Sequence, residues 1–262
     1  MEKETVKPEP ATKAANKGEI VIAIKGLKKS FGKKEVLKNI NLDLKRGENI
    51  VVLGRSGTGK SVTIECIVGL LNPDGGTLKV FGDEVADMND KELKELRMKV
   101  GFLFQSGALY DSMTVRENLE FPLTRVLRLD DQREIDKRVN EVLDGVGLAD
   151  AIDKLPSDLS GGMRKRAGLA RTLIVHPEIM LYDEPTTGLD PITSREISEL
   201  ILNMQQKYKT SSIIITHDME CARITSDRIL IMDDGAYIAE GSFNELHQSK
   251  NKIVQSFFKD IS

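Results

Sequence analysis

Hydrophobic positions along the chain switch repeatedly between the period of a strand and the period of a helix. Apolar and polar residues alternate over 21–31 and again over 35–44, with a Gly-Lys-Lys break between them, which predicts an antiparallel pair of strands. Short, bounded apolar runs predict buried strands at 49–53, 76–82, 100–104, 179–182 and 212–216. Apolar residues three and four apart predict helices at 61–71, 89–98, 161–175 and 192–208.

The middle of the chain, residues 106–160, has helical signals and no strand signal. Thr114 and Glu117 have the spacing of a capping box, and a helical pattern over 130–144 is followed by Gly145. This segment predicts a helical lobe inserted into a core in which strands and helices alternate. Because that alternation is typical of parallel sheets, we expect an α/β fold, closed by a hairpin over 228–241 that turns at Asp234-Gly235.

The two ends of the chain differ from this core. Residues 1–18 are rich in Lys, Glu, Pro and Ala without periodicity, which predicts a disordered tail rather than a signal peptide. Residues 246–262 contain an amphipathic helical pattern made by Ile253, Val254, Phe257, Phe258 and Ile261. This helix fits packing on its own core, contact with a second subunit or accessory protein, or, least well, adsorption to a membrane. The domain between the ends spans 19–245.

Composition and charge exclude several classes of protein. Of 262 residues, 40% are hydrophobic and 30% charged, as in soluble globular proteins. The net charge of −3, the absence of Trp and the 5% aromatic content argue against a nucleic-acid partner. The longest apolar run is about five residues, where a membrane span needs about 20. Cys66 and Cys221 lie in apolar patterns typical of buried free thiols, so we expect a cytoplasmic protein whose membrane work requires a partner.

The most specific motif in the sequence lies between a predicted strand and a predicted helix. It reads Gly54-Arg55-Ser56-Gly57-Thr58-Gly59-Lys60-Ser61 and matches the phosphate-binding loop pattern G-x-x-x-x-G-K-[ST]. Its glycines allow backbone N–H groups to surround phosphates at a helix N-terminus. Lys60 would reach the β- and γ-phosphates, and the Ser61 hydroxyl would ligate Mg²⁺.

Two further motifs suit the same chemistry. The apolar strand at 179–182 ends in Asp183 and Glu184, where the first carboxylate could hold Mg²⁺ and the second could polarise an attacking water. Ser160, followed by Gly161 and Gly162, is a good N-cap with exposed N–H groups. By mechanism alone this second motif fits an anion-binding helix terminus and a plain helix cap equally well.

Taken in order, these motifs resemble the ATP-binding subunit of an ABC transporter over about residues 19–245. The resemblance is carried by Phe31, GRSGTGKS, Gln105, LSGGM, LYDE, GLDP and His217. It implies the ABC ATPase fold, which has a P-loop NTPase (RecA-like) core, an antiparallel β subdomain and an inserted α-helical subdomain. It also implies ATP and Mg²⁺ as cofactors.

The resemblance implies a role for each matching residue. The catalytic residues are Glu184, Gln105, which senses Mg²⁺ and the attacking water, and His217, which clamps the γ-phosphate. Phe31 stacks on adenine, and Asp190 lies at the seam of a dimer. ATP contacts from one subunit are Gly54, Arg55, Ser56, Gly57, Thr58, Gly59, Lys60, Ser61 and Val62, and those from the other are Ser160, Gly161 and Gly162. The Mg²⁺ ligands are Ser61, Gln105 and Asp183.

Three of these residues also fit a structural role when judged without the rest of the set. His217 follows an apolar strand and fits a satisfied core histidine. Phe31 fits a core residue of the hairpin, and Gln105 fits a polar residue at a strand end.

One departure from the family pattern helps to identify a subgroup. The signature usually ends in Gln, whereas this chain has Met163, whose thioether cannot replace the hydrogen bonds of an amide. The serine and glycines remain, so we expect activity. Together with 103–109 and 190–193, this signature resembles the ATPases of the Mla/Mce phospholipid transport systems.

The function predicted from the sequence is ATP hydrolysis by a homodimer that powers phospholipid transport between bacterial membranes. The implied location is the cytoplasmic face of the inner membrane. Implied partners are integral membrane permease subunits and, beyond these, an Mce-type lipid-binding subunit and a small cytoplasmic accessory protein. The alternatives are the ATPase of a small-solute importer, for example for amino acids, and a soluble assembly ATPase resembling the SUF system. A phosphate-loop kinase or GTPase would not explain LSGGM.

Overall fold

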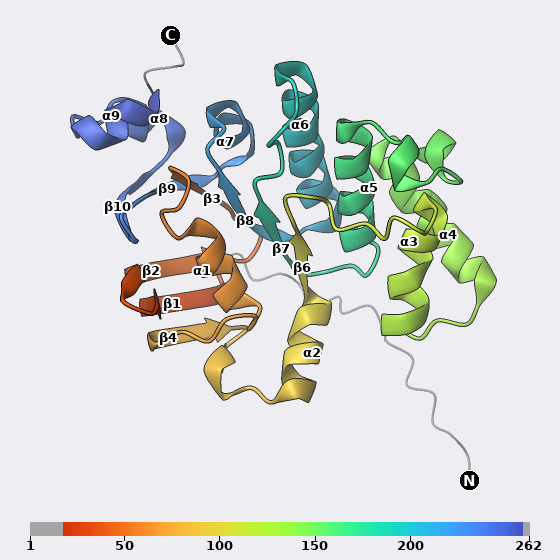
Figure 1. The fold of residues 1–262 in the computed structure, drawn as a ribbon, viewed down its shortest axis with the longest axis horizontal. Helices are drawn as coiled ribbons and strands as arrows, with labels where there is room; N and C mark the ends of the chain where they lie inside the picture. The colour runs from red at the N-terminus through yellow and green to blue at the C-terminus, as the bar shows by residue number, and fades with distance from the viewer. Residues whose placement is uncertain (1–17, 259–262) are drawn as a thin grey trace.

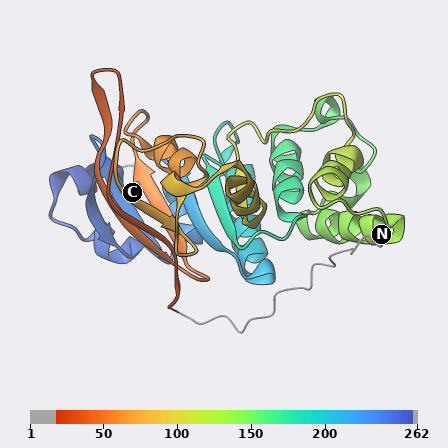
Figure 2. The ribbon, with the colours of Figure 1, turned by 90° about the horizontal axis from the view of Figure 1, so that it is seen from below.

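The computed structural model describes residues 18–258, which form two β-sheets and the helices around them (Figure 1). The predicted disordered tail over 1–18 lies outside the described residues apart from Gly18, and Ile261 lies outside them as well. Figures 1 and 2 show the inserted helices at one end of the molecule and the antiparallel sheet at the opposite end. The predicted α/β fold, with its antiparallel and helical subdomains, is confirmed.

The larger sheet has six strands in the order β10-β9-β3-β8-β7-β6, of which all but β10 run parallel. The β9–β10 hairpin turns at Asp234-Gly235 as predicted, and the φ values of 43° and 77° there match the turn type that such a pair favours. The strands are β3 (Asn49–Gly54), β6 (Val100–Leu103), β7 (Ile179–Asp183), β8 (Ser211–Thr216), β9 (Arg228–Asp233) and β10 (Ala236–Gly241).

Both faces of this sheet are covered, which explains why its strands read as unbroken apolar runs. In β3, for example, Val51 and Leu53 join one core cluster, whereas Ile50 and Val52 join the other. The first cluster contains side chains of α5 (Gly161–Leu173), α6 (Pro191–Tyr208) and α7 (Met219–Thr225). The second contains side chains of α1 (Lys60–Ile67), α2 (Asp90–Lys99) and the antiparallel sheet.

The antiparallel sheet has the order β2-β1-β4-β5. Its strands are β1 (Ile20–Phe31), β2 (Lys34–Lys45), β4 (Gly75–Val80) and β5 (Asp83–Glu84). The predicted pairing of the first two strands is confirmed. The strand predicted to reach Gly82 ends at Val80, because Phe81 and Gly82 have φ values of 53° and 93° and form the turn into β5.

The regular elements of the inserted lobe, residues 106–160, are all helical, as predicted. It contains α3 (Val115–Phe121), a π-helical turn at Pro122–Val126, α4 (Gln132–Val146) and two 3₁₀ turns, at Ala149–Ala151 and Pro156–Asp158. Thr114 and Glu117 form the predicted capping box at the start of α3. The predicted end of α4 at Gly145 is wrong. Gly147 ends the helix, because its φ of 68° lets its N–H and that of Leu148 reach back to the last turn.

The helix predicted over 61–71 also ends early. It stops at Ile67 because Gly69 has a φ of 64°, and the N–H groups of Leu70 and Leu71 donate to Glu65 O instead of continuing the helix. Two short helices, α7 and α8 (Phe243–His247), were not predicted. Helix α7 begins after the N-cap Asp218. The sequence shows this capping residue, but the helix is too short for a clear helical repeat of apolar residues to follow it.

The C-terminal helix α9 (Lys252–Phe258) packs against the core of its own chain. Val254 and Phe258 are buried in the first core cluster, and the Phe258 ring lies 5.4 Å from the ring of Phe243 in α8. The predicted burial of both cysteines is confirmed. Burial raises the pKa of the Cys66 thiol to about 11 and that of Cys221 to about 12, so neither is a reactive thiolate near neutral pH.

Candidate functional site

Three adjacent parallel strands end at one edge of the larger sheet. In the order β3-β8-β7 they lead into the phosphate loop, into His217 and into Asp183-Glu184. The register pairs Asp183, the last residue of β7, with Ile215, the last but one of β8, so the two strands end side by side. Residues from three distant parts of the sequence are therefore brought together by strand order.

The phosphate loop joins β3 to α1 and requires glycine at particular positions. Gly57 and Gly59 have φ values of 80° and 106°, in the region that favours glycine. A Cβ on Gly59 would lie 2.8 Å from Leu37 Cδ2 and 2.9 Å from Val36 O, so the antiparallel sheet also packs too closely for a side chain. Arg55 and Ser56 are exposed, the Thr58 hydroxyl donates to Arg55 O at 2.9 Å, and Val62 is half-buried in α1.

Lys60 is held inside its own loop. Its side chain is 6% exposed, and Nζ donates to Gly54 O at 2.7 Å and to Arg55 O at 3.1 Å. It also lies 3.6 Å from Glu184 Oε1. An ammonium group positioned among loop carbonyls and beside a carboxylate is placed at the edge where a phosphate chain would enter.

Ser61 and Asp183 form a contact between α1 and β7. The Ser61 hydroxyl donates to Asp183 Oδ1 at 3.0 Å. Burial raises the pKa of Asp183 above its usual value, and the hydrogen bond from Ser61 opposes that shift. The pair places a hydroxyl and a carboxylate oxygen side by side, which are ligands that Mg²⁺ accepts.

The carboxylate of Glu184 joins the two sides of the site. Its Oε1 faces Lys60, while its Oε2 lies 2.8 Å from His217 Nδ1 and accepts from the Thr187 hydroxyl at 3.2 Å. Glu184 itself has a φ of 49°, an unusual value for a residue with a side chain. The side chain of His217 is 63% exposed, so it is not a satisfied core histidine.

Gln105 lies two residues beyond β6 and is exposed. Its main-chain oxygen accepts from Lys165 Nζ at 2.5 Å, and the same ammonium lies 3.3 Å from Glu184 O. Sequence reasoning missed Lys165. The available signal was a cation near the start of α5, spaced three residues from Gly168 and six from Arg171. In the sequence alone, that spacing cannot be told from a solvent-exposed face of the helix.

Five of the residues predicted at the nucleotide site lie apart from this group. Ser160 caps α5 and Asp190 caps α6, and within residues 18–258 the hydrogen bonds of both side chains stay within their own helix starts. Gly161 and Gly162 follow in the first turn of α5. Phe31 ends β1 and is 49% exposed, with Lys29 Nζ 5.6 Å from its ring centre, so it is not a core residue of the hairpin.

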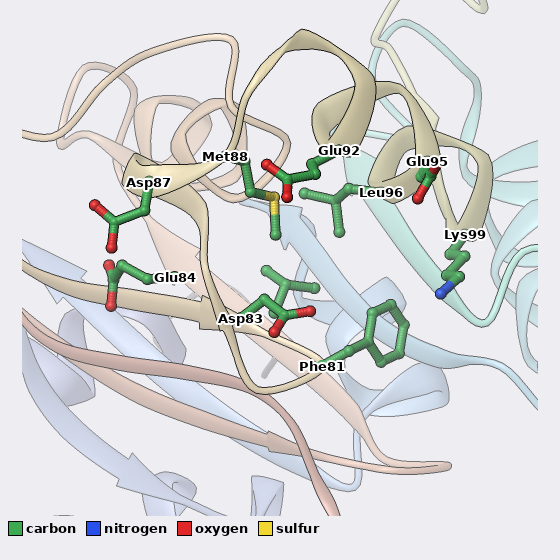
Figure 3. Close-up of a pocket in the computed structure, with 10 residues that line it drawn as sticks. Phe81, Asp83, Glu84, Asp87, Met88, Glu92, Glu95, Leu96 and Lys99 are labelled. Atoms are coloured by element: carbon green, nitrogen blue, oxygen red, sulfur yellow. The ribbon is translucent and has the colours of Figure 1, made fainter.

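Two cavities lie near these elements. One, of about 490 Å³, is bounded by Gly54, Arg55 and His217 on the site side and by Phe257 of α9 on the other. The second, of about 330 Å³, lies between β4–β5 and α2, and Figure 3 shows carboxylates from both sides around an apolar floor. None of the predicted site residues lines this second cavity, so it is separate from the nucleotide site.

Comparison with known proteins agrees with this geometry. A model of the ABC transporter family matches residues 37–187. The probable ribonucleotide transport ATP-binding protein mkl of Mycobacterium leprae is 39% identical over 238 residues, which cover 91% of this chain and 68% of the relative. The chloroplastic protein TRIGALACTOSYLDIACYLGLYCEROL 3 of Arabidopsis thaliana is 38% identical over 259 residues, 92% of this chain and 74% of the relative. The methionine import ATP-binding protein MetN of Carboxydothermus hydrogenoformans is 41% identical over 224 residues, 84% of this chain and 66% of the relative.

Solved structures show the same architecture. The structure of cbiO1 from Clostridium perfringens, part of the ABC transporter complex cbiONQ, superposes with a TM-score of 0.81 at 30% identity, over 92% of this chain and 95% of that one. The dimeric post-hydrolysis state of the ATP-binding cassette MJ0796, bound to ADP and Pi, has a TM-score of 0.76 at 32% identity, over 85% of this chain and 98% of that one.

The fold and the site define a phosphate-loop nucleotide hydrolase of the ATP-binding cassette class. The chain belongs to the ABC transporter family, whose cassettes bind ATP, and it is an ATP hydrolase. Cassettes of this kind form dimers and work with membrane permeases. In the part of the chain that the structure describes, no helix is both long enough and apolar enough to cross a bilayer.

Proposed function

We propose that this chain hydrolyses ATP at a site shared by two copies, with the residues of the sheet edge in the roles that the sequence suggested. Lys60 and the loop N–H groups bind the β- and γ-phosphates, and Phe31 stacks on adenine. Ser61, Asp183 and the Gln105 side chain would hold Mg²⁺, which supplies neutralisation of phosphate charge when bound. Val62, the exposed loop residues Arg55 and Ser56, and the half-buried Thr58 complete the nucleotide cradle.

The position of Glu184 carries this proposal. Its carboxylate lies between Lys60 Nζ, at 3.6 Å, and His217 Nδ1, at 2.8 Å, so it stands beside the two groups that would contact the γ-phosphate. A carboxylate there accepts a hydrogen bond from an attacking water and orients it for in-line attack. The His217 side chain is 63% exposed, so it is open to a phosphate group that enters the site.

The second copy supplies the remaining contacts. The N-terminus of α5, with Ser160, Gly161 and Gly162, offers N–H groups and partial positive charge to phosphate, yet it makes no hydrogen bond to its own phosphate loop within residues 18–258. Ile192, two residues after Asp190, is 74% exposed and is suited to burial at a dimer seam. The dimeric state of the MJ0796 cassette supports this arrangement.

Replacing Glu184 with Gln tests the catalytic assignment. The amide keeps the size of the side chain but cannot polarise water, so we expect kcat to fall by about 10²- to 10⁴-fold while the Kd for ATP changes less than about threefold. Steady-state hydrolysis and binding of a fluorescent ATP analogue measure the two effects.

Glu178→Gln is the matched control, since Glu178 lies at the other end of β7 and pairs with Arg46 at 2.9 Å. Loss of that half-buried pair, which lies away from the sheet end that carries Glu184, should leave kcat within about twofold. Near-normal turnover of Glu184→Gln would refute its role as the water-orienting group.

The cargo that we propose is phospholipid, moved between bacterial membranes by an Mla/Mce-type system, with this chain on the cytoplasmic face of the inner membrane. The LSGGM signature supports this, and so does 38% identity to the Arabidopsis relative, which is named for a galactolipid. The partners would be a permease and, through it, an Mce-type lipid-binding subunit, with a small cytoplasmic accessory protein. Residues 19–245 would form the catalytic domain, and 246–262 would form an appendage to it.

Import of a small solute is the second candidate, favoured by the 41% identity to a methionine import protein. The two candidates predict different partners. A tagged chain is recovered from gently solubilised membranes, and the retained proteins are identified by mass spectrometry. A permease with an Mce-type subunit supports the phospholipid proposal. A permease with a solute-binding protein refutes it in favour of import.

A further inference from the structure

One face of α5 holds the main chain of the loop that carries Gln105. Lys165 and Arg171 both reach this loop and lie six residues apart on the helix. Lys165 Nζ donates to Gln105 O at 2.5 Å, and Arg171 Nη1 donates to Ala108 O at 2.8 Å. The loop over 105–108 is therefore tied by its carbonyls to α5, the helix that follows the inserted lobe, and must move with it.

Close packing between these two cations strengthens the attachment. Gly168 lies between them on α5, and a Cβ there would be 2.7 Å from Gly107 O and 3.0 Å from Gly107 Cα. Backbone contact of this kind leaves no layer of side chains that could slide. The helix and the loop behave as one unit.

Lys165 differs from Arg171 because it also reaches the core of the protein. Its ammonium lies 3.3 Å from Glu184 O, so a single group on α5 contacts the main chain of both Gln105 and Glu184. Lys165 is only 7% exposed, and burial lowers its pKa while the nearby carboxylates of Asp183 and Glu184 oppose that shift. Burying a cation is costly, and its partners here are main-chain oxygens on either side of the site.

We propose that Lys165 is a positioning residue for ATP hydrolysis: its ammonium sets the main chain of Gln105 relative to that of Glu184. The two side chains that act on the attacking water are thereby aligned by the orientation of α5. A shift of α5 relative to β7 would carry the Gln105 loop with it and lengthen the contact of Lys165 with Glu184 O, which is the weaker of the two. Alignment for hydrolysis is then available only in one orientation of α5.

This inference rests on the proposed function of Gln105 and Glu184, and the test separates the two. Lys165→Met removes the ammonium but keeps the length and the apolar stem of the side chain. Since a misplacement of about 1 Å can cost about 10²-fold in rate, we expect kcat to fall by about 10- to 100-fold, with the Kd for ATP within about twofold. Lys165→Arg restores donors for both carbonyls and should bring kcat back to within about fivefold of the parent.

Arg171→Met is the matched control. It removes the other cationic tether of the loop from the same helix face but makes no contact with Glu184. We expect its kcat to stay within about threefold of the parent, because Lys165 still joins the two parts of the site. Thermal unfolding of each variant shows whether it is folded. If Lys165→Met is not folded, Lys165→Gln, which keeps one polar donor group, takes its place, and we expect its kcat to fall by about 10-fold.

Several outcomes would overturn the proposal. These are an unchanged kcat in Lys165→Met, an equal loss in Arg171→Met, a parallel loss of ATP binding, or failure of Lys165→Arg to recover activity beyond the Met variant. Full turnover by Glu184→Gln would instead refute the proposed function, whatever Lys165→Met does. The two failures are therefore distinguishable.

Discussion

Replacing Gly168 with alanine has two effects of opposite sign on the free energy of unfolding. Gly168 lies in the interior of α5, where alanine is intrinsically better than glycine by about 0.5–1 kcal/mol. Against this gain, the new Cβ would lie 2.7 Å from Gly107 O, about 0.7 Å closer than an ordinary contact, and 3.2 Å from Leu103 Cδ1. The nearest atom is a backbone oxygen, so a rotamer change cannot relieve the clash.

Overpacking of this kind costs about 1–3 kcal/mol, so Gly168→Ala should be neutral to destabilising by about 2 kcal/mol after the helix gain. Gly145 supplies the matched control, because it also lies inside a helix, α4. A Cβ there would meet first the flexible end of Lys207, with Nζ at 3.2 Å, and then Met204 Sδ at 3.7 Å. Gly145→Ala should therefore stabilise the protein by about 0.5–1 kcal/mol.

The difference between the two variants isolates the contact of α5 with the loop, since the helix term is common to both. Urea unfolding of both proteins gives the free energies, and we expect them to differ by about 1–3 kcal/mol. Because the clash pushes the 105–108 loop away from α5, ATP hydrolysis should also fall in Gly168→Ala but not in Gly145→Ala. Equal stabilities within about 0.5 kcal/mol would refute the close packing of helix and loop.

Two further predictions concern single side chains. Phe31→Ala should weaken ATP binding by about 1–3 kcal/mol if the ring stacks on adenine, whereas Phe31→Tyr should bind ATP like the parent. The free energy of unfolding should not change in either variant, because Phe31 is already 49% exposed. Equal ATP affinity of the Ala and Tyr variants in a binding titration would contradict the stacking. Burial lowers the pKa of His176, so below about pH 6.5 the unfolded chain takes up this proton before the folded protein does, and stability falls on acidification. His176→Asn, which tolerates the φ of 56° there, should lose less stability between pH 7.5 and 5.5 than the parent, and identical losses in urea unfolding would contradict this.

Local signals were sufficient for much of the fold. The capping box at Thr114 depends on residues three apart, and the Asp234-Gly235 turn depends on its own two residues, so both are as predicted. The phosphate loop is also a local motif, and its glycines have the backbone angles that its chemistry requires. Motifs whose interactions are formed by residues close together in the sequence are therefore predicted correctly.

Helix ends needed more than the local pattern. Gly145 and Gly147 are both capable of ending α4, and the first predicted end was wrong because the apolar face continues to Val146, which is buried. Likewise α1 ends at Ile67, although apolar residues continue to Leu71. Tertiary packing decides at which of two possible residues each helix ends, and the local sequence does not indicate which one.

The sequence by itself determined the identity of the chemical groups: a phosphate loop, two carboxylates after a strand and a histidine after another. Only the tertiary structure decided their geometry. The order β3-β8-β7 places the Glu184 carboxylate between Lys60 and His217, and the packing of α5 brings Lys165 to the main chain of Glu184. The physical reason is that residue chemistry is a local property of the chain, whereas strand order and helix docking depend on burying two apolar faces of one sheet at once.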